Sequence, residues 1–162
     1  MAIRSIREIG DKVLTKKSRV VEEMTPRIGE LIEDMIETMY ASNGVGLAAP
    51  QVGILKRIVV IDVYDGNGPY VLINPNIVET SGEQTGDEGC LSVPGKAGQV
   101  TRPDYARVEA LNKDMEPFVL EGEGLLARAI CHECDHLEGI LYVDLVEGEL
   151  HDVTYEDDED EE

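Results

Sequence analysis

Cys-His-Glu-Cys-Asp-His-Leu-Glu-Gly, at residues 131–139, is the stretch from which the fold and function of this chain can best be inferred. His132 and His136 stand four positions apart, so on a helix both imidazoles leave the same face, where one metal ion can bridge them. Glu133 directly follows the first histidine. This His-Glu-x-x-His arrangement is typical of sites in which the glutamate takes a proton from metal-bound water. A surface helix that carries two histidines by chance is the alternative.

The residues before the motif favour a core-facing helix over that alternative. We predict a helix over residues 125–138, with Gly139 at the position of a C-terminal cap. Both histidines and Glu133 fall inside its apolar arc, and the charged residues that fall outside are Arg128, Asp135 and Glu138. An ionised glutamate on a buried stripe is costly unless it is paired or near a metal, so the position of Glu133 indicates a functional role.

Length and charge narrow the class of protein. The 162 residues contain no Pro/Ser-rich linker, and we expect one domain over residues 1–155 followed by a disordered acidic tail over residues 156–162. The 34 acidic and 14 basic residues give a net charge of -20, which argues against direct nucleic-acid or membrane binding through a broad electrostatic surface. No segment has the length of a membrane span, and we expect a cytoplasmic protein.

The other elements indicate an α+β fold. Thr25 as N-cap and Pro26 at the first helical position begin an amphipathic helix, which Asn43-Gly44 ends. Strands are predicted at residues 58–63 and 70–73, joined as a hairpin by the turn residues 65–68, with residues 77–79 extending the sheet. Two further strands, at residues 105–111 and 117–120, are expected to pair with each other, and an acidic, glycine-rich loop is expected at residues 81–89. We therefore expect mixed, mostly antiparallel sheets packed around the C-terminal helix that carries the histidine motif, with the amphipathic helix near the N-terminus.

Residues 44–51, Gly-Val-Gly-Leu-Ala-Ala-Pro-Gln, formally match a G-x-G-x-x-A dinucleotide fingerprint. Their context excludes that function, because the fingerprint follows a strand and opens a helix, whereas this stretch follows a helix and leads into a strand. Its glycines permit close approach of another group to the backbone, and Gln51 supplies an amide. An ordinary helix-to-strand turn is the alternative.

A catalytic metal site uses three protein ligands and an open position. Cys90 is the candidate third ligand, with a buried inert thiol as the alternative, while His151 lies beside the acidic tail and has no supporting motif. Cys131 and Cys134 form a Cys-x-x-Cys pair without the βαβ context of a redox motif. On the predicted helix they point away from the histidines, so we do not expect them to share the metal.

Residues 44–51, 88–92 and 132–136 resemble, in this order and at similar spacing, the three signature motifs of peptide deformylases. The resemblance extends from Ala2 to about Asp144 and implies a single metallohydrolase domain. The implied activity is hydrolytic removal of the N-formyl group from the formyl-methionine of nascent polypeptides, as part of protein biosynthesis. The implied partners are those nascent peptides, with transient proximity to the ribosome.

Motif positions imply the metal-site residues. Cys90, His132 and His136 would hold one divalent metal, and Glu133 would be the general acid/base that acts with a metal-bound hydroxide. Fe(II) is the expected metal, with Zn, Ni or Co as alternatives, because a thiolate and two imidazoles suit several of these ions.

The same resemblance implies the substrate-binding residues. Gln51 and the backbone N–H of Leu91 would stabilise the oxyanion, and Gly46 would contact the substrate backbone. Val45 and the helix face around Ala129 would line the methionine pocket.

Two features keep other interpretations open. Some peptide deformylases carry a basic C-terminal helix associated with ribosome docking, whereas this chain is strongly acidic from Glu147 onward, so we do not expect that mode of attachment. A metallopeptidase would share the helix motif, but its third ligand normally follows that helix. A non-catalytic metal or redox protein would use the cysteine pair and would need neither Glu133 nor Gln51.

Overall fold

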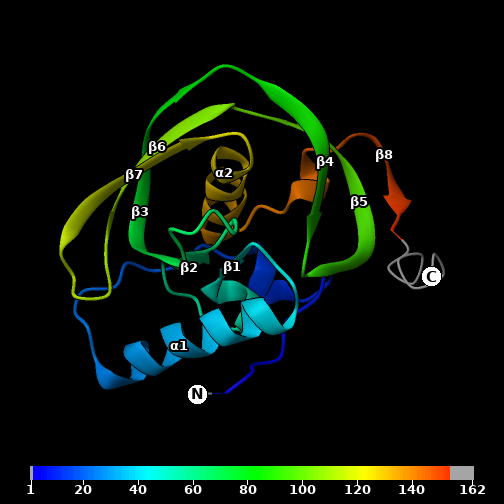
Figure 1. The fold of residues 1–162 in the computed structure, drawn as a ribbon. Helices are drawn as coiled ribbons and strands as arrows, with labels where there is room; N and C mark the ends of the chain where they lie inside the picture. Colours follow the sequence, from blue (N-terminus) through cyan, green and yellow to red (C-terminus); the bar gives the residue numbers. More distant parts are fainter. Residues whose placement is uncertain (1, 154–162) are drawn as a thin grey trace.

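A computed structural model describes residues 2–153 and confirms the α+β class. Two antiparallel sheets flank helix α2, and helix α1 lies across one end of the molecule (Figure 1). The bounds of the elements are α1 Pro26–Ala41, β1 Gly46–Ala48, β2 Ile58–Ile61, β3 Tyr70–Ser81, β4 Gln84–Cys90, β5 Val93–Arg102, β6 Tyr105–Leu111, β7 Pro117–Glu123, α2 Leu125–Leu137 and β8 Glu147–Asp152, with 3-10 turns η1 Lys12–Thr15, η2 Ala49–Val52 and η3 Tyr142–Asp144.

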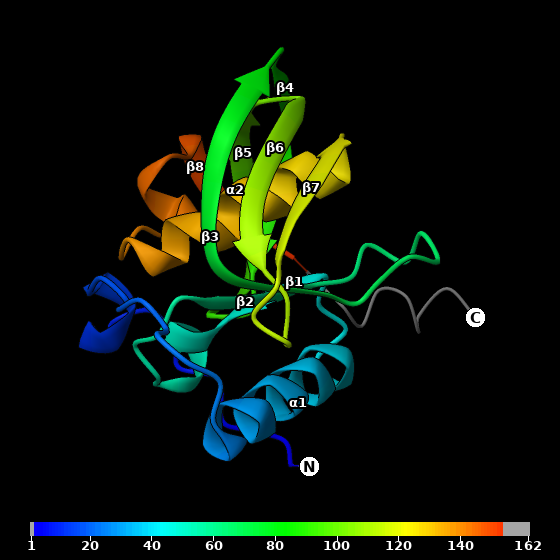
Figure 2. The ribbon, with the colours of Figure 1, turned by 90° about the vertical axis from the view of Figure 1, so that its left-hand side faces the viewer.

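The larger sheet has five strands in the order β1-β2-β3-β6-β7, and Figure 2 shows its long strands beside α2. The predicted hairpin is confirmed, since Ile58 pairs with Ile73 and Ile61 with Tyr70. Strand β3 continues after a shift of register that follows Ile73, so the expected extension at residues 77–79 belongs to the same strand, which ends at Ser81. The predicted pairing of residues 105–111 with the strand that follows them is confirmed as β6 and β7.

The smaller sheet corrects the expectation of a loop at residues 81–89. Strand β4 occupies most of this segment and pairs with β5, which in turn pairs with β8; neither β5 nor β8 was predicted. The less exposed positions of β4 alternate, as in any strand, but they are Gln84, Gly86, Glu88 and Cys90. No apolar alternation marks β4 in the sequence because this face meets polar groups of the site.

Helix α1 begins where the sequence predicts. The Thr25 side chain accepts a hydrogen bond from the Ile28 N–H at 3.2 Å, and Pro26 occupies the first turn. The buried face of α1 packs against β1 and β2 in a cluster that includes Ile28, Leu31, Ile32, Met35, Met39, Leu47, Ile58 and Val60. This cluster is the core beneath the larger sheet, and it supports the segment that joins α1 to β1.

Helix α2 ends close to its predicted terminus. Gly139 has φ 80°, and a Cβ there would lie 2.6 Å from the Thr15 carbonyl oxygen, so both the conformation and the space require glycine. The apolar face of α2 packs against the larger sheet through Leu126, Ala127, Ala129, Ile130 and Leu137. The glycine-rich stretch 44–51, for which a helix-to-strand turn was the alternative interpretation, contains strand β1 and most of the 3-10 turn η2.

The domain boundaries stay a prediction. The expected domain over residues 1–155 contains the two sheets and both α-helices of the described part, and the expected tail at residues 156–162 lies outside the described residues. Among residues 2–153, no helix is long and apolar enough to cross a membrane.

Candidate metal centre and active site

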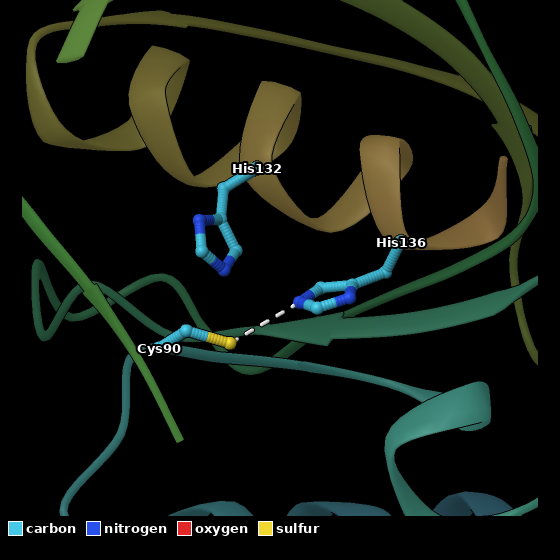
Figure 3. A group of neighbouring side chains, drawn as sticks. All are labelled: Cys90, His132 and His136. Atoms are coloured by element: carbon cyan, nitrogen blue, oxygen red, sulfur yellow. Dashed lines mark hydrogen bonds between the residues drawn. The ribbon is translucent and has the colours of Figure 1, made fainter. Parts of the chain in front are cut away.

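Three side chains, one from β4 and two from α2, converge in the space between these two elements. Cys90 ends β4, and His132 and His136 lie one turn apart on α2, so that one ligand atom from each lies within 4.8 Å of the others. The Cys90 Sγ and His136 Nε2 atoms are 3.3 Å apart (Figure 3). His151, the competing ligand candidate, instead lies with its Nε2 3.3 Å from Asp87 Oδ2 at the surface. The structure therefore brings together the three residues expected to hold the metal.

These side chains fit a divalent metal ion. Metal–ligand bonds of about 2.0–2.3 Å place the ligand atoms of a tetrahedral site roughly 3–4 Å apart, which agrees with the Cys90–His136 separation. Burial lowers the pKa of His136 well below its usual range, so its imidazole is neutral, the form that binds metals. Three protein ligands leave a fourth position for water or substrate.

Glu88 orients the first histidine. The His132 Nδ1 atom lies 2.5 Å from Glu88 Oε2, which leaves Nε2 of the same ring on the opposite side for a metal. Burial raises the pKa of Glu88, but hydrogen bonds from His132 and Arg102 outweigh it and hold that pKa at about 2. Glu88 is therefore an ionised acceptor, and we infer that it fixes the tautomer of His132.

Two buried arginines neutralise Glu88. Arg102 donates from Nε and Nη2 at 3.1 and 2.6 Å, and Arg128 donates from Nη1 at 2.7 Å. The sequence placed Arg128 outside the apolar arc, yet only 8% of it is exposed, because its guanidinium turns to Glu88. Sequence reasoning missed Glu88 as a functional residue. The available signal was a charged residue two positions before Cys90, since residues two apart on a strand share a face.

Cys131 and Cys134 belong to the core. Cys131 is a member of the cluster between α2 and the larger sheet, and Cys134 packs against that cluster. Burial raises the pKa of Cys131 to about 11 and that of Cys134 to about 12. Thiols that keep their protons in an apolar setting are unreactive, which argues against the redox alternative.

Glu133 is a buried acid beside the metal ligands. It is 4% exposed, its Oε1 has no hydrogen-bond partner, and its Oε2 lies 3.9 Å from His132 Nε2. Burial raises the pKa of Glu133 to about 7. A carboxyl group with a pKa near neutrality can both accept and return a proton, as general acid–base catalysis requires.

A cavity of about 270 Å³ opens over these groups. Its lining includes Val45, Gly46, Leu91, Leu125, Ala129 and Glu133. A Cβ at Gly46 would lie 2.5 Å from Glu133 Oε2, so this glycine permits β1 to pass directly against the acid. Leu91, at the turn after β4, lies beside Cys90 in the same lining.

Gln51 is held in a single orientation at the floor of the site. Its Oε1 accepts a hydrogen bond from the Ala48 N–H at 2.9 Å, and its Nε2 donates to Ser92 Oγ at 3.0 Å. The same Nε2 lies 3.5 Å from Cys90 Sγ. The amide nitrogen therefore lies beside one of the three proposed metal ligands. All four residues expected to act on the substrate, Gly46, Gln51, Leu91 and Glu133, line the cavity.

Comparisons with known proteins agree on one family. The polypeptide deformylase family model matches residues 3–150. The peptide deformylase of Lachnoclostridium phytofermentans is 65% identical over the full length of both chains. That of Agathobacter rectalis is 69% identical and covers 97% of this chain and 98% of its own.

Solved structures show the same fold. The peptide deformylase of Legionella pneumophila superposes with a TM-score of 0.87 at 44% identity, covering 90% of this chain and 86% of its own. The peptide deformylase of Synechococcus elongatus, solved in complex with actinonin, gives 0.84 at 43% identity, with 88% and 78% covered.

Proposed function

This chain belongs to the polypeptide deformylase family and removes the N-formyl group from the N-terminal methionine of nascent polypeptides, and we propose that it does so at the Cys90 site. The observation that carries the proposal is the convergence of Cys90, His132 and His136 beside a buried Glu133 whose Oε1 has no hydrogen-bond partner. A purely structural metal site does not require an acidic side chain with a raised pKa in a cavity beside its ligands.

The family is metal-dependent, and we propose that Cys90, His132 and His136 hold one divalent ion. When bound, that ion supplies Lewis acidity, which lowers the pKa of a water and polarises a carbonyl oxygen. We propose Fe(II) as the metal, with Zn, Ni or Co able to occupy the same three ligands. Metal analysis of protein purified without oxygen tests this choice.

Glu133 would carry the proton of the reaction. It would take a proton from the water that attacks the formyl carbon, and it would return that proton to the departing amine as the C–N bond breaks. The products are formate and a peptide with a free N-terminus. The burial of Glu133 supports this role, since its pKa of about 7 makes both transfers accessible near neutral pH.

Gln51 and the Leu91 backbone N–H would stabilise the oxygen of the tetrahedral intermediate. Gln51 suits this role because the Ala48 N–H holds its carbonyl oxygen, so its N–H donors need no reorientation during the reaction. One such donor is worth about 2.7–4 kcal/mol in the transition state.

The substrate would lie along β1. Gly46 would contact the peptide backbone of the substrate, and the methionine side chain would enter the apolar part of the cavity beside Val45, Leu125 and Ala129. A cytoplasmic location and transient proximity to the ribosome, where formylated chains emerge, are part of the proposal.

Release of formate from a formyl-Met peptide by the metal-loaded protein tests the activity. We expect release that depends on the metal and that Glu133→Gln lowers at least about a hundredfold. A longer peptide with a blocked, unformylated N-terminus serves as the control. Cleavage of that peptide at an internal bond, without formate release from the first, would identify a metallopeptidase and contradict the proposal.

A further inference from the structure

Tyr64 is an exposed residue that is nevertheless held in an unusual conformation. It is 60% exposed and lies in the β2–β3 connection, which Figure 2 shows as a projecting loop. Its φ of 62° is left-handed, which is uncommon for a residue with a side chain. Its N–H donates to Asp62 Oδ1 at 2.7 Å, and its hydroxyl donates to the Gly44 carbonyl at 3.2 Å.

Asp62 connects this loop to α1 and to the segment before β1. Its own N–H donates to the Val45 carbonyl at 2.8 Å, and its Oδ2 accepts a hydrogen bond from the hydroxyl of Tyr40 at the end of α1. The hydrogen bond to Asp62 raises the pKa of Tyr40 to about 12, so this hydroxyl keeps its proton. We call Tyr40, Asp62 and Tyr64 together the Asp62 clamp.

The carbonyls that the clamp holds belong to a wall of the active-site cavity. Residues 43–46 line that cavity and lie between two groups of the proposed machinery. A Cβ at Gly44 would lie 2.7 Å from Leu91 Cδ1, and a Cβ at Gly46 would lie 2.5 Å from Glu133 Oε2. A small outward movement of this segment would therefore change where a peptide lies relative to Glu133.

The stability of the fold alone does not explain why Tyr64 is held in a left-handed conformation. A left-handed conformation costs free energy for a residue with a side chain, and such strain persists only where its surroundings impose it. A side chain that is 60% exposed recovers little of this cost by apolar burial. Its hydrogen bond to Gly44 is the contact that connects it to the site.

We propose that Tyr64, acting through the Gly44 carbonyl and supported by Asp62 and Tyr40, is a positioning residue that keeps residues 44–46 in the conformation that binds the formylated peptide. The proposal rests on the proposed function, since it assumes that these residues contact substrate. Loss of the clamp lowers the fraction of molecules that can bind, which weakens apparent affinity by that fraction and leaves the bound complex unaltered.

Tyr64→Phe in the metal-loaded, full-length protein tests this directly, because phenylalanine can adopt the same backbone and removes only the hydroxyl. We expect KM for a formyl-Met peptide to rise roughly threefold to tenfold, the value of one neutral hydrogen bond, with kcat unchanged. Tyr105→Phe is the matched control, since it removes a hydroxyl that donates to Glu121, away from the cavity. A KM for Tyr64→Phe equal to that of wild type overturns the proposal.

A second pair of variants tests whether the clamp acts as a unit. Tyr40→Phe removes the hydrogen bond to Asp62 Oδ2, so Tyr40→Phe and the double variant with Tyr64→Phe should raise KM by similar factors. If the factors by which the two single variants raise KM multiply in the double variant, the two hydroxyls act independently, and the clamp is overturned.

Amide hydrogen exchange separates this proposal from the proposed function. The Asp62 N–H bonded to Val45, and the peptide containing residues 43–46, should exchange faster in Tyr64→Phe than in the wild type and the Tyr105→Phe control. Absence of formate release from the wild type contradicts the proposed function and leaves this measurement intact. Unchanged exchange overturns the clamp whether or not the protein is active.

Discussion

His132 Nδ1 and Glu88 Oε2 lie 2.5 Å apart, so a residue on β4 orients a proposed metal ligand on α2. The carboxylate belongs to the strand that also ends in Cys90, so one strand supplies both a ligand and the support of another. Two of the three proposed ligands therefore depend on the register of β4.

We predict that Glu88→Gln weakens metal binding about 10- to 100-fold, as is typical when the hydrogen-bonding partner of a ligand is lost. The amide cannot neutralise Arg102 and Arg128, so the thermal stability of the metal-free variant should also fall. Titration of metal into metal-free protein measures the first effect. Asp87→Asn, at the exposed neighbouring position, is the control, and an affinity equal to wild type in Glu88→Gln would exclude an orienting role.

The pH dependence of stability should carry the signature of Glu88. Its pKa is lowered from 4.5 to about 2 in the folded protein, so its contribution is present above pH 4.5 and is lost as pH falls towards 2. The shift corresponds to about 3 kcal/mol. We expect urea unfolding of the metal-free wild type to lose more stability over this pH range than Glu88→Gln does. Parallel curves for the two proteins would contradict the assignment.

Glu133→Gln should retain the metal and lose at least about a hundredfold in kcat, the lower end of what a general acid/base contributes. In the wild type, the base must be ionised, so kcat/KM should fall as pH decreases through the pKa of Glu133. That pKa is about 7 in the metal-free site, and a bound cation lowers it, so the acid limb should lie at or below pH 7. Metal analysis beside the rate measurement distinguishes this outcome from loss of a ligand.

Cys90→Ala should remove the third ligand and with it most of the bound metal and turnover, because two histidines alone hold a divalent ion weakly. Cys131→Ala removes a thiol of the core and should leave metal content intact while lowering stability. Full metal content and rate in Cys90→Ala would place the third ligand elsewhere.

Gly46→Ala should lower kcat/KM and stability together, since its Cβ would lie 2.5 Å from Glu133 Oε2 and displace either β1 or the acid. Gly29→Ala in α1 is the control, because a Cβ there meets nothing within 4 Å and alanine favours the helix by roughly 0.5–1 kcal/mol. Peptide hydrolysis and thermal melting of both variants measure the contrast. A fully active Gly46→Ala would show that β1 can move without cost.

Local sequence was sufficient for both α-helices and for the histidine pair. Thr25 and Pro26 begin α1, and the spacing of His132 and His136 depends only on the helical repeat, so nearby residues carry all the information. Cys90 could be named as a ligand candidate because few other residues could complete the site. The resemblance of three motifs then identified the family that the comparisons confirm.

Only the tertiary structure determined which polar side chains of different elements contact one another. Strand β4 was not predicted because its sequence shows no apolar alternation. Its inward face is polar, since Glu88 on that face contacts Arg102, Arg128 and His132. Arg128 is buried for the same reason, since a partner on another element neutralises it. The Asp62 clamp likewise joins segments distant in sequence. Hydrophobic periodicity reports which face of an element is buried in a core, whereas ion pairs and hydrogen bonds between elements depend on how the chain packs.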